Sequence, residues 1–227
     1  CAHGAAVERF RAGRHGAIGL VVNLEPKHPA TDDRLDAEAA ARAGAYMNRQ
    51  SHDPLFLGRY PEELPVFFGD AWPRLAPEDF GLIRQPIDFL GVNYYSRGIV
   101  RDDPASRPAR ARSILPDHAP RTAMGWEIYP EGLREILEWV RRCYGGIPLY
   151  ITENGAAFAD PAPGPDGPVE DAPRIEYFRE HLRAARAAMA NGVDVRGYFA
   201  WSLLDNFEWQ YGYSKRFGLY HVDFKTQ

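Results

Sequence analysis

The chain has 227 residues, of which 45% are hydrophobic and 13% aromatic, and its formal net charge is −4. These values are typical of a packed globular domain and exclude a disordered chain. The negative charge gives no electrostatic basis for nucleic-acid binding, and no apolar run reaches the ~18 residues of a membrane span. The two cysteines, Cys1 and Cys143, form no disulfide or metal pattern, so we expect a reducing, cytoplasmic environment.

The first half of the chain alternates helix and strand signals. A helical pattern opens the sequence, and the apolar run 17–24, AIGLVVNL, predicts a strand covered on both faces. An alanine-rich helix is predicted from about 35 to 50, then a connection rich in proline and aromatic residues over 53–73. The run IDFLGVNYYS, 87–96, predicts a second buried strand, followed by a long polar loop to about Gly125.

The second half continues the alternation. A helix follows Pro130, with apolar residues at 133, 136, 137 and 140 on one face. Strands are predicted at 147–155 and 193–201, separated by an exposed loop over 161–168 and a helix from Pro173 to Asn191–Gly192. That helix carries a stripe of Ile175, Phe178, Leu182, Ala185 and Met189, and a last short run, GLYHVDF, closes the chain.

Strands that alternate with helices favour parallel βαβ units. A doubly wound sheet and a (β/α)8 barrel both fit this alternation, and only four strand–helix units are present. The chain begins without methionine inside a helical pattern and ends without a capping element. We therefore expect residues 1–227 to be one part of a single, longer catalytic domain.

Polar side chains gather where the predicted strands end. In a parallel barrel these carboxyl ends share one mouth, where active sites are built. Glu153 is the sharpest candidate, because Thr152-Glu153-Asn154-Gly155 places a carboxylate at a strand tip and a glycine that permits close backbone approach. The structural alternative is an ordinary helix-capping or loop glutamate. The other tip residues are Asn23, Glu25, Asn93, Tyr94, Tyr95, Asn154 and the stretch from Trp201 to Trp209.

The stretch 201–218, WSLLDNFEWQYGYSKRFG, combines aromatic and polar residues. Sugars present apolar C–H faces and rings of hydroxyls, so a sugar site needs aromatic platforms beside hydrogen-bonding groups. Glu208 supplies an acceptor and Trp209 an indole donor. Each tryptophan alone is more often a core residue, but the cluster with Tyr211, Tyr213 and Phe217 favours a binding surface.

Four motifs, FLGVNYYS, MGWEIYPEGL, YITENG and WSLLDNFEW…YSKRFGLYHVDF, resemble glycoside hydrolase family 1, the retaining β-glucosidases, in order and spacing. The resemblance covers nearly the whole chain. It implies a (β/α)8 TIM barrel of which this chain carries the C-terminal half, strands five to eight. It also implies hydrolysis of terminal β-D-glucosyl residues, with tolerance of galactosides or fucosides.

The resemblance assigns a role to each of eight residues. Glu153 matches the nucleophile of a double displacement, and Tyr95 matches the tyrosine that hydrogen-bonds and orients it. Substrate contacts are implied for the other six: Asn93 as a polar neighbour, Trp201 as the platform under the sugar, Glu208 for O4 and O6, Trp209 for O3, Phe217 in the pocket wall and Trp126 on the aglycone side. Relatives often have a cis peptide between the residues that match Trp201 and Ser202.

Glu25 resembles the second carboxyl group that a retaining hydrolase needs, because the family's acid/base lies in an Asn-Glu-Pro tripeptide after strand four. Here Asn23-Leu24-Glu25-Pro26 has one extra residue, and one inserted residue in a strand sends the glutamate side chain to the opposite face. In addition, residues 17–30 align with strand five of the family and not with strand four. Glu25 is therefore expected to lie at the rim and not to be the acid. The acid/base is expected from residues outside this chain. Because an open half-barrel would expose strand edges, the chain is expected to need the N-terminal half of the barrel, a swapped copy or another covering chain.

Two other functions stay open: a lectin-like protein that keeps the aromatic cluster without using Glu153, and an inactive fragment that requires its other half. No cofactor or metal is expected, because the seven histidines lack ligand spacing and no glycine-rich phosphate loop follows a strand. The expected partners are thus a β-glucoside or oligosaccharide substrate and the other half of the barrel.

Overall fold

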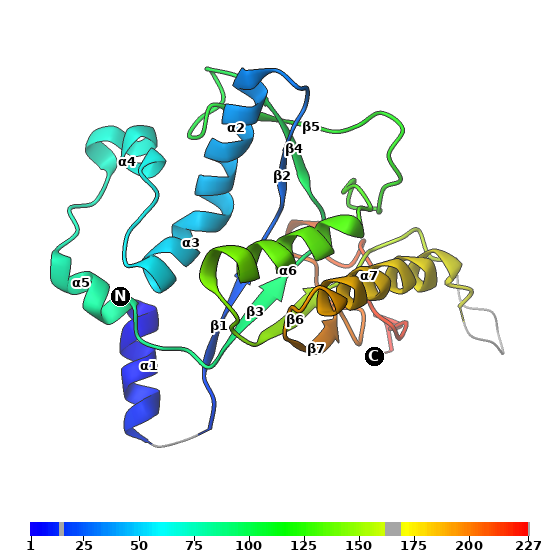
Figure 1. Cartoon of the computed structure of the whole chain (residues 1–227). Coiled ribbons are helices and arrows are strands. Elements are labelled where there is room, and N and C mark those ends of the chain that lie inside the picture. Colours follow the sequence, from blue (N-terminus) through cyan, green and yellow to red (C-terminus); the bar gives the residue numbers. More distant parts are fainter. Residues whose placement is uncertain (14–15, 162–168, 227) are drawn as a thin grey trace.

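The computed structural model describes residues 1–13, 16–161 and 169–226. Its centre is a four-stranded parallel sheet in the order β1-β3-β6-β7 (Figure 1). The strands are β1 (Gly19–Asn23), β3 (Phe89–Asn93), β6 (Leu149–Asn154) and β7 (Val195–Ala200). All four predicted strands are therefore present, and they lie side by side in chain order, as consecutive strands of a barrel do.

The helices α6 (Glu131–Tyr144) and α7 (Ala172–Ala190) cover one face of this sheet (Figure 1). The apolar face predicted for α6 is confirmed, because Leu133, Ile136, Leu137 and Val140 are at most 2% exposed. They pack with alternate strand residues, Leu90, Val92, Leu149 and Ile151, in the main hydrophobic core. Alternation places these strand residues on the helix side and their neighbours on the opposite side.

Of the apolar stripe predicted for α7, only Ala185 is buried, and most of the residues that the helix buries lie outside the stripe. Ile175, Leu182 and Met189 are about half exposed, at 57%, 48% and 50%. The buried residues are Arg174, Tyr177, His181, Ala184, Ala185 and Ala188. The alanines allow α7 to approach the core closely. Arg174, Tyr177 and Nδ1 of His181 have hydrogen-bond partners there, whereas Nε2 of His181 is buried without one.

A second, three-stranded sheet in the order β2-β4-β5 was not predicted. It consists of β2 (Lys27–Pro29), β4 (Gly98–Asp102) and β5 (Ala111–Ile114), and α2 (Arg34–Gly44) packs on it. The expected polar loop before Gly125 therefore contains two strands. These strands are short and have few apolar residues; β4 pairs in parallel with the distant β2 and antiparallel with the neighbouring β5.

The structure also differs from the predicted helix boundaries and connections. The α-helix expected from 35 to 50 ends at Gly44 and continues as a π-helix, η1 (Ala45–Arg49). The connection expected after it contains several short helical elements: α3 (Gln50–His52), η2 (Asp53–Leu57), α4 (Glu63–Phe68), η3 (Gly69–Ala71) and α5 (Pro77–Ile83). The final run GLYHVDF forms only an isolated bridge between Tyr220 and Leu204. The predicted loop at 161–168 lies, apart from Pro161, outside the described residues. The opening helix is α1 (Ala2–Ala12), which contacts α5.

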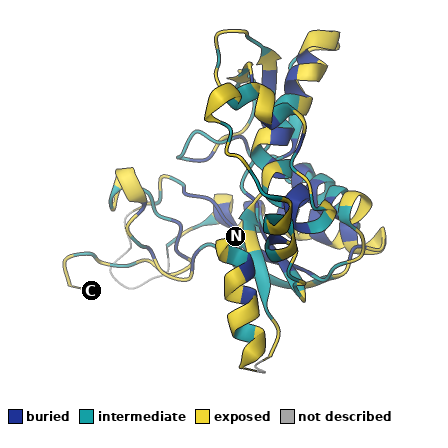
Figure 2. Ribbon diagram, turned by 90° about the vertical axis from the view of Figure 1, so that its left-hand side faces the viewer, coloured by how far each residue is buried: buried dark blue, intermediate teal, exposed yellow. Residues whose placement is uncertain are grey.

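The sheet face opposite α6 and α7 is open. Val21 and Phe199 on this face are 49% and 57% exposed, whereas the buried residues gather between the sheet and its helices (Figure 2). Parallel sheets are normally covered on both faces. No helix in the described part of the chain is long and apolar enough to cross a membrane.

Candidate active site

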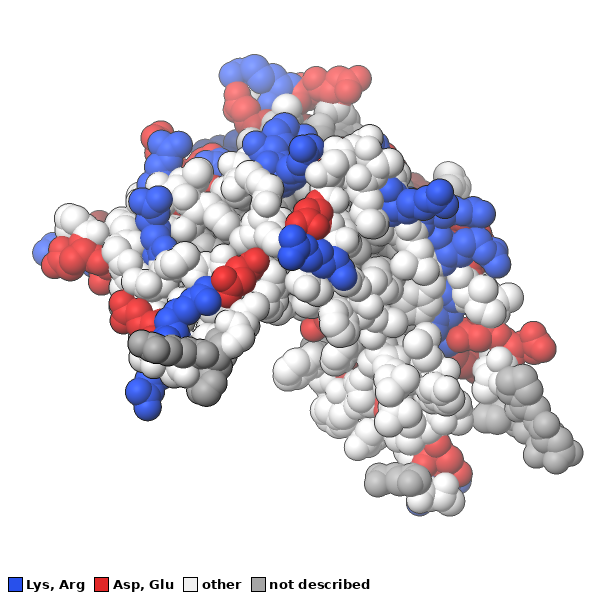
Figure 3. All heavy atoms as spheres, turned by 60° about the horizontal axis from the view of Figure 1, so that its bottom comes forward, with Lys and Arg blue, Asp and Glu red and all other residues white. Residues whose placement is uncertain are grey.

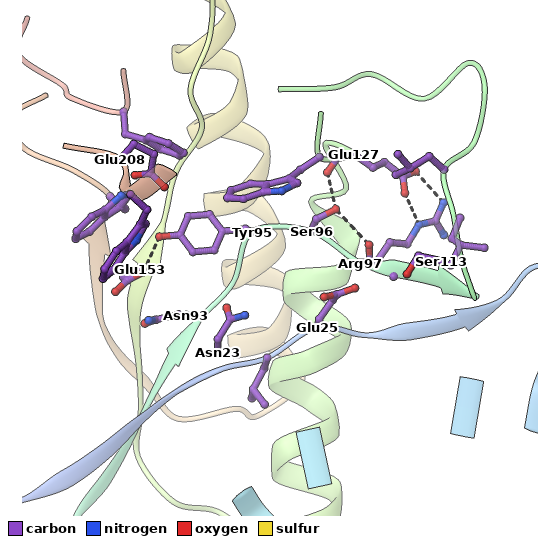
Figure 4. Close-up of a pocket in the computed structure, with 18 of the residues that line it drawn as sticks. Asn23, Glu25, Asn93, Tyr95, Ser96, Arg97, Ser113, Glu127, Glu153 and Glu208 are labelled. Carbon is purple, nitrogen blue, oxygen red and sulfur yellow. Dashed lines mark hydrogen bonds and ion pairs between the residues drawn. The ribbon is translucent and has the colours of Figure 1, made fainter. Parts of the chain in front are cut away.

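A cavity of about 590 Å³ lies at the carboxyl ends of the four parallel strands (Figure 4). Asn23, Asn93, Glu153 and Trp201 line it, and each follows or ends a different strand. All eight predicted site residues line this one cavity, from segments up to 124 positions apart (Asn93 to Phe217, 217 − 93). The volume is in the usual range of small-molecule sites.

Glu153 accepts a hydrogen bond of 2.6 Å from the Tyr95 hydroxyl (Figure 4). Burial, the hydrogen bond and the negative charge of Glu153 raise the pKa of Tyr95 far above 10. The phenol therefore remains a proton donor toward the carboxylate over the whole neutral range. This contact fixes the orientation of the Glu153 side chain.

Asn93 lies beside this pair, opposite Glu153 in the β3–β6 register. The Thr152 hydroxyl donates a hydrogen bond of 2.7 Å to Oδ1 of Asn93. The amide nitrogen of Asn93 is thereby left as the donor for a ligand in the cavity. Thr152 itself was not predicted as a site residue, and its position in the strand gave no signal for this role.

Two neighbours hold the end of β6 in place. Asn154 is fully buried and donates 2.8 Å to the backbone oxygen of Tyr94 and 3.1 Å to the hydroxyl of Tyr177. A Cβ on Gly155 would lie 1.8 Å from the backbone oxygen of Trp201. The close backbone approach expected at Gly155 is thus present, and it brings the loop after β7 against the tip of β6.

Asp205 organises the loop that carries Glu208, Trp209 and Phe217. Its side chain is 2% exposed, pairs with Arg216, and accepts hydrogen bonds of 2.9 and 3.1 Å from the backbone nitrogens of Gly218 and Val222. Sequence reasoning missed this residue, because its partners are contacts of the folded loop. The cis peptide expected between Trp201 and Ser202 is present.

The aromatic residues of this loop do not all face the cavity. Phe217 is 2% exposed and its ring lies 6.4 Å from that of Tyr95 and 6.3 Å from that of Trp126. Trp209 lines the cavity but is 81% exposed. Tyr211 and Tyr213, the other tyrosines of the predicted cluster, are not among the residues that line this cavity.

Glu208 is the carboxylate of the last loop that lines the cavity beside Glu153, and it is 8% exposed. Burial, and then the negative charge of Glu153, raise its pKa. Both groups point into the region that Figure 4 shows between the β6 tip and the last loop. No group of acidic, histidine or cysteine side chains in the described ranges is arranged to hold a metal ion.

At the other end of the cavity, Glu25 was expected near the rim, but Arg97 and Ser113 were not predicted as site residues. Glu25, Arg97 and Ser113 line it, and Figure 4 shows them on the far side of Asn23 from Glu153. Arg97 forms a two-point ion pair with Glu127, at 2.9 Å for each contact, next to Trp126. The motif MGWEI could have indicated Glu127, but Arg97 has no local signal.

The chain belongs to a known family of carbohydrate hydrolases. The sequence profile of glycosyl hydrolase family 1 matches residues 1–227, so the chain is a member of that family. It is 45% identical over 232 residues to 1,4-β-D-glucan glucohydrolase of Thermotoga neapolitana, covering 100% of this chain and 53% of that protein. It is 44% identical over 229 residues to β-glucosidase A of Acetivibrio thermocellus, covering 99% and 51%.

The structure agrees with this assignment. Family 1 β-glucosidase from Thermotoga maritima superposes with a TM-score of 0.94 at 43% identity, covering 99% of this chain and 50% of that one. The chain therefore spans about half the length of its relatives and corresponds to the C-terminal half of their TIM barrel. The predicted family and fold are confirmed.

Proposed function

We propose that the protein to which this chain contributes is a retaining β-glucosidase with Glu153 as its nucleophile. The observation that carries the proposal is the convergence of four strand tips on one cavity, with the Glu153 carboxylate oriented by Tyr95 at 2.6 Å. The T. neapolitana relative is named a glucan glucohydrolase. A structure of the T. maritima relative contains a transition-state mimic, a cyclophellitol analogue.

In the first step, a carboxylate oxygen of Glu153 attacks the anomeric carbon and the glycosidic C–O bond breaks. A general acid outside this chain gives its proton to the leaving oxygen. In the second step, the same group removes a proton from water, and the hydroxide oxygen attacks the anomeric carbon and releases Glu153. Two inversions retain the β configuration.

The remaining cavity residues would bind the glucosyl ring. Trp201 offers an aromatic face to the C–H side of the sugar, and Asn93 offers the amide nitrogen that Thr152 leaves unpaired. Glu208 would accept hydrogen bonds from O4 and O6, and the Trp209 indole would donate to O3. Phe217 and Trp126 would form the wall toward the leaving group.

The N-terminal half of the same barrel is the proposed partner. Two residues of the open sheet face, Val21 and Phe199, are 49% and 57% exposed, which is high for a parallel sheet. Trp209 is 81% exposed, which is high for a side chain proposed to contact a sugar. In the view of Figure 3, uncharged atoms form much of the surface, and charged side chains lie near the middle as well as toward the edges. Strands from the other half would cover this face and supply the general acid. The free cysteines Cys1 and Cys143 suit a cytoplasmic location.

Replacing Glu153 by glycine in the complete protein tests the proposal. We expect turnover of an aryl β-glucoside to fall at least about 10⁴-fold, and azide to restore turnover by occupying the vacated space, giving an α-glucosyl azide. A matched Glu38→Gly variant, on the exposed side of α2, is expected to keep wild-type turnover, once melting shows that it is folded. A lectin-like protein would show no turnover in the wild type and unchanged sugar binding in Glu153→Gly.

A further inference from the structure

Glu25 is held as a fixed hydrogen-bond acceptor at the end of the cavity remote from Glu153. The Asn48 side chain accepts from the backbone nitrogen of Glu25 at 3.1 Å and donates to its backbone oxygen at 2.8 Å. Asn48 is 5% exposed, so this double contact is rigid. It fixes the backbone just beyond the tip of β1.

The carboxylate of Glu25 is held as well. Nζ of Lys27 lies 2.6 Å from Oε1, and the two side chains are 12% and 27% exposed. No described residue hydrogen-bonds Oε2. One oxygen is therefore occupied and the other is available to a ligand, while the ion pair leaves the site without net charge.

Gly98 makes room for this arrangement. A Cβ at position 98 would lie 2.2 Å from Oε1 of Glu25 and 2.6 Å from Nζ of Lys27. The β2-β4-β5 sheet thus places the carboxylate in the cavity through a close approach of β4. Ile99 and Leu115 add apolar side chains to the same end.

Figure 4 shows Glu25 near Arg97 and Ser113, with Asn23 and Asn93 between it and Glu153. Arg97 is occupied by its contacts with Glu127. Glu25 therefore presents a carboxylate oxygen, Oε2, that no described residue occupies, and the Ser113 hydroxyl lies at the same end. A ligand that reaches it while its first ring lies at Glu153 must extend past Asn23.

We infer that Glu25 determines leaving-group specificity by accepting hydrogen bonds from the hydroxyls of a second sugar, so that the preferred substrates are β-linked gluco-oligosaccharides. This inference rests on the proposed function. An acceptor-only oxygen requires O–H donors, which a sugar offers and a flat aryl group does not. An apolar leaving group would remove water from Oε2 without replacing its hydrogen bond.

Calorimetry tests this inference. It measures the affinities of glucose and of cellobiose for the complete protein, in which Glu153→Gln prevents turnover. Glucose reports the site at Glu153, and the ratio of the two affinities reports the contact with the second sugar. In Glu25→Ala we expect the cellobiose-to-glucose affinity ratio to fall about tenfold or more, the range of a hydrogen bond to a charged group. Gly98→Ala should lower the same ratio, because its methyl group displaces the Glu25 carboxylate.

The control is Glu38→Ala, which removes an exposed carboxylate on α2 that pairs only with Arg34 among the described residues. Melting temperatures establish that all variants are folded. An unchanged ratio in Glu25→Ala, or parallel losses for both sugars, overturns the inference. Parallel assays with Glu153 intact separate the two proposals. If the protein shows no turnover but binds cellobiose more tightly than glucose, and this preference depends on Glu25, only the hydrolase proposal is refuted. If the protein binds neither sugar, both proposals are overturned.

Discussion

The hydroxyl of Tyr95 can be removed without changing the packing around it. Its ring lies 5.3 Å from Trp126 and 6.4 Å from Phe217, so phenylalanine fits the same space. The change deletes one hydrogen bond of 2.6 Å to the Glu153 carboxylate. A hydrogen bond to a charged group contributes about 1.5–3 kcal/mol, and about 1.4 kcal/mol corresponds to a tenfold change in rate. We therefore expect kcat of Tyr95→Phe to fall about ten- to hundredfold.

The assay measures kcat and KM for an aryl β-glucoside with the complete protein. Because the hydroxyl orients the nucleophile and does not contact the leaving group, KM should change less than kcat. Tyr46→Phe, a partly exposed tyrosine that packs on Phe68 away from the cavity, is the matched control. A kcat within twofold of wild type for Tyr95→Phe would refute the orienting role and with it the assignment of Glu153.

Three further predictions concern the fold around the site. Asp205→Ala leaves buried donors without their acceptor; we expect a loss of roughly 3–5 kcal/mol in the free energy of unfolding, measured by urea titration, and a loss under 1 kcal/mol would contradict the role of Asp205. Gly155→Ala places a methyl group 1.8 Å from the Trp201 oxygen; we expect failure to fold or lost sugar binding, by circular dichroism and calorimetry, and a stable, binding variant would disprove the close approach. Burial lowers the pKa of His52 and His181 from 6.5 to about 4. The unfolded chain thus binds protons that the folded chain does not, and stability should fall as pH drops below about 6.5, by about 2 kcal/mol per histidine at pH 5. His52→Leu should reduce this difference between pH 7.5 and pH 5, and an equal pH dependence would contradict it.

The accuracy of the sequence predictions follows the range of the interactions involved. The four strands and the buried face of α6 were predicted because their periodicity is local. The β2-β4-β5 sheet was not, because its strands are short and Gly98–Asp102 pairs with the distant segment Lys27–Pro29 as well as with its neighbour Ala111–Ile114. For α7 the apolar stripe contained only one of the buried residues, Ala185, because Tyr177 and His181 gain buried partners that periodicity does not reveal.

The sequence by itself determined the family, the parallel α/β architecture and the eight side chains of the candidate site, because strand tips and motifs are written in consecutive residues. Only the tertiary structure decided how those side chains meet. It set the hydrogen bond from Tyr95 to Glu153 that the family resemblance had implied, closed the last loop on Asp205, and placed the Glu25 carboxylate at the far end of the same cavity. These outcomes depend on contacts between residues 11 to 58 positions apart, which form only when the chain folds and are not visible as a periodic pattern in the sequence.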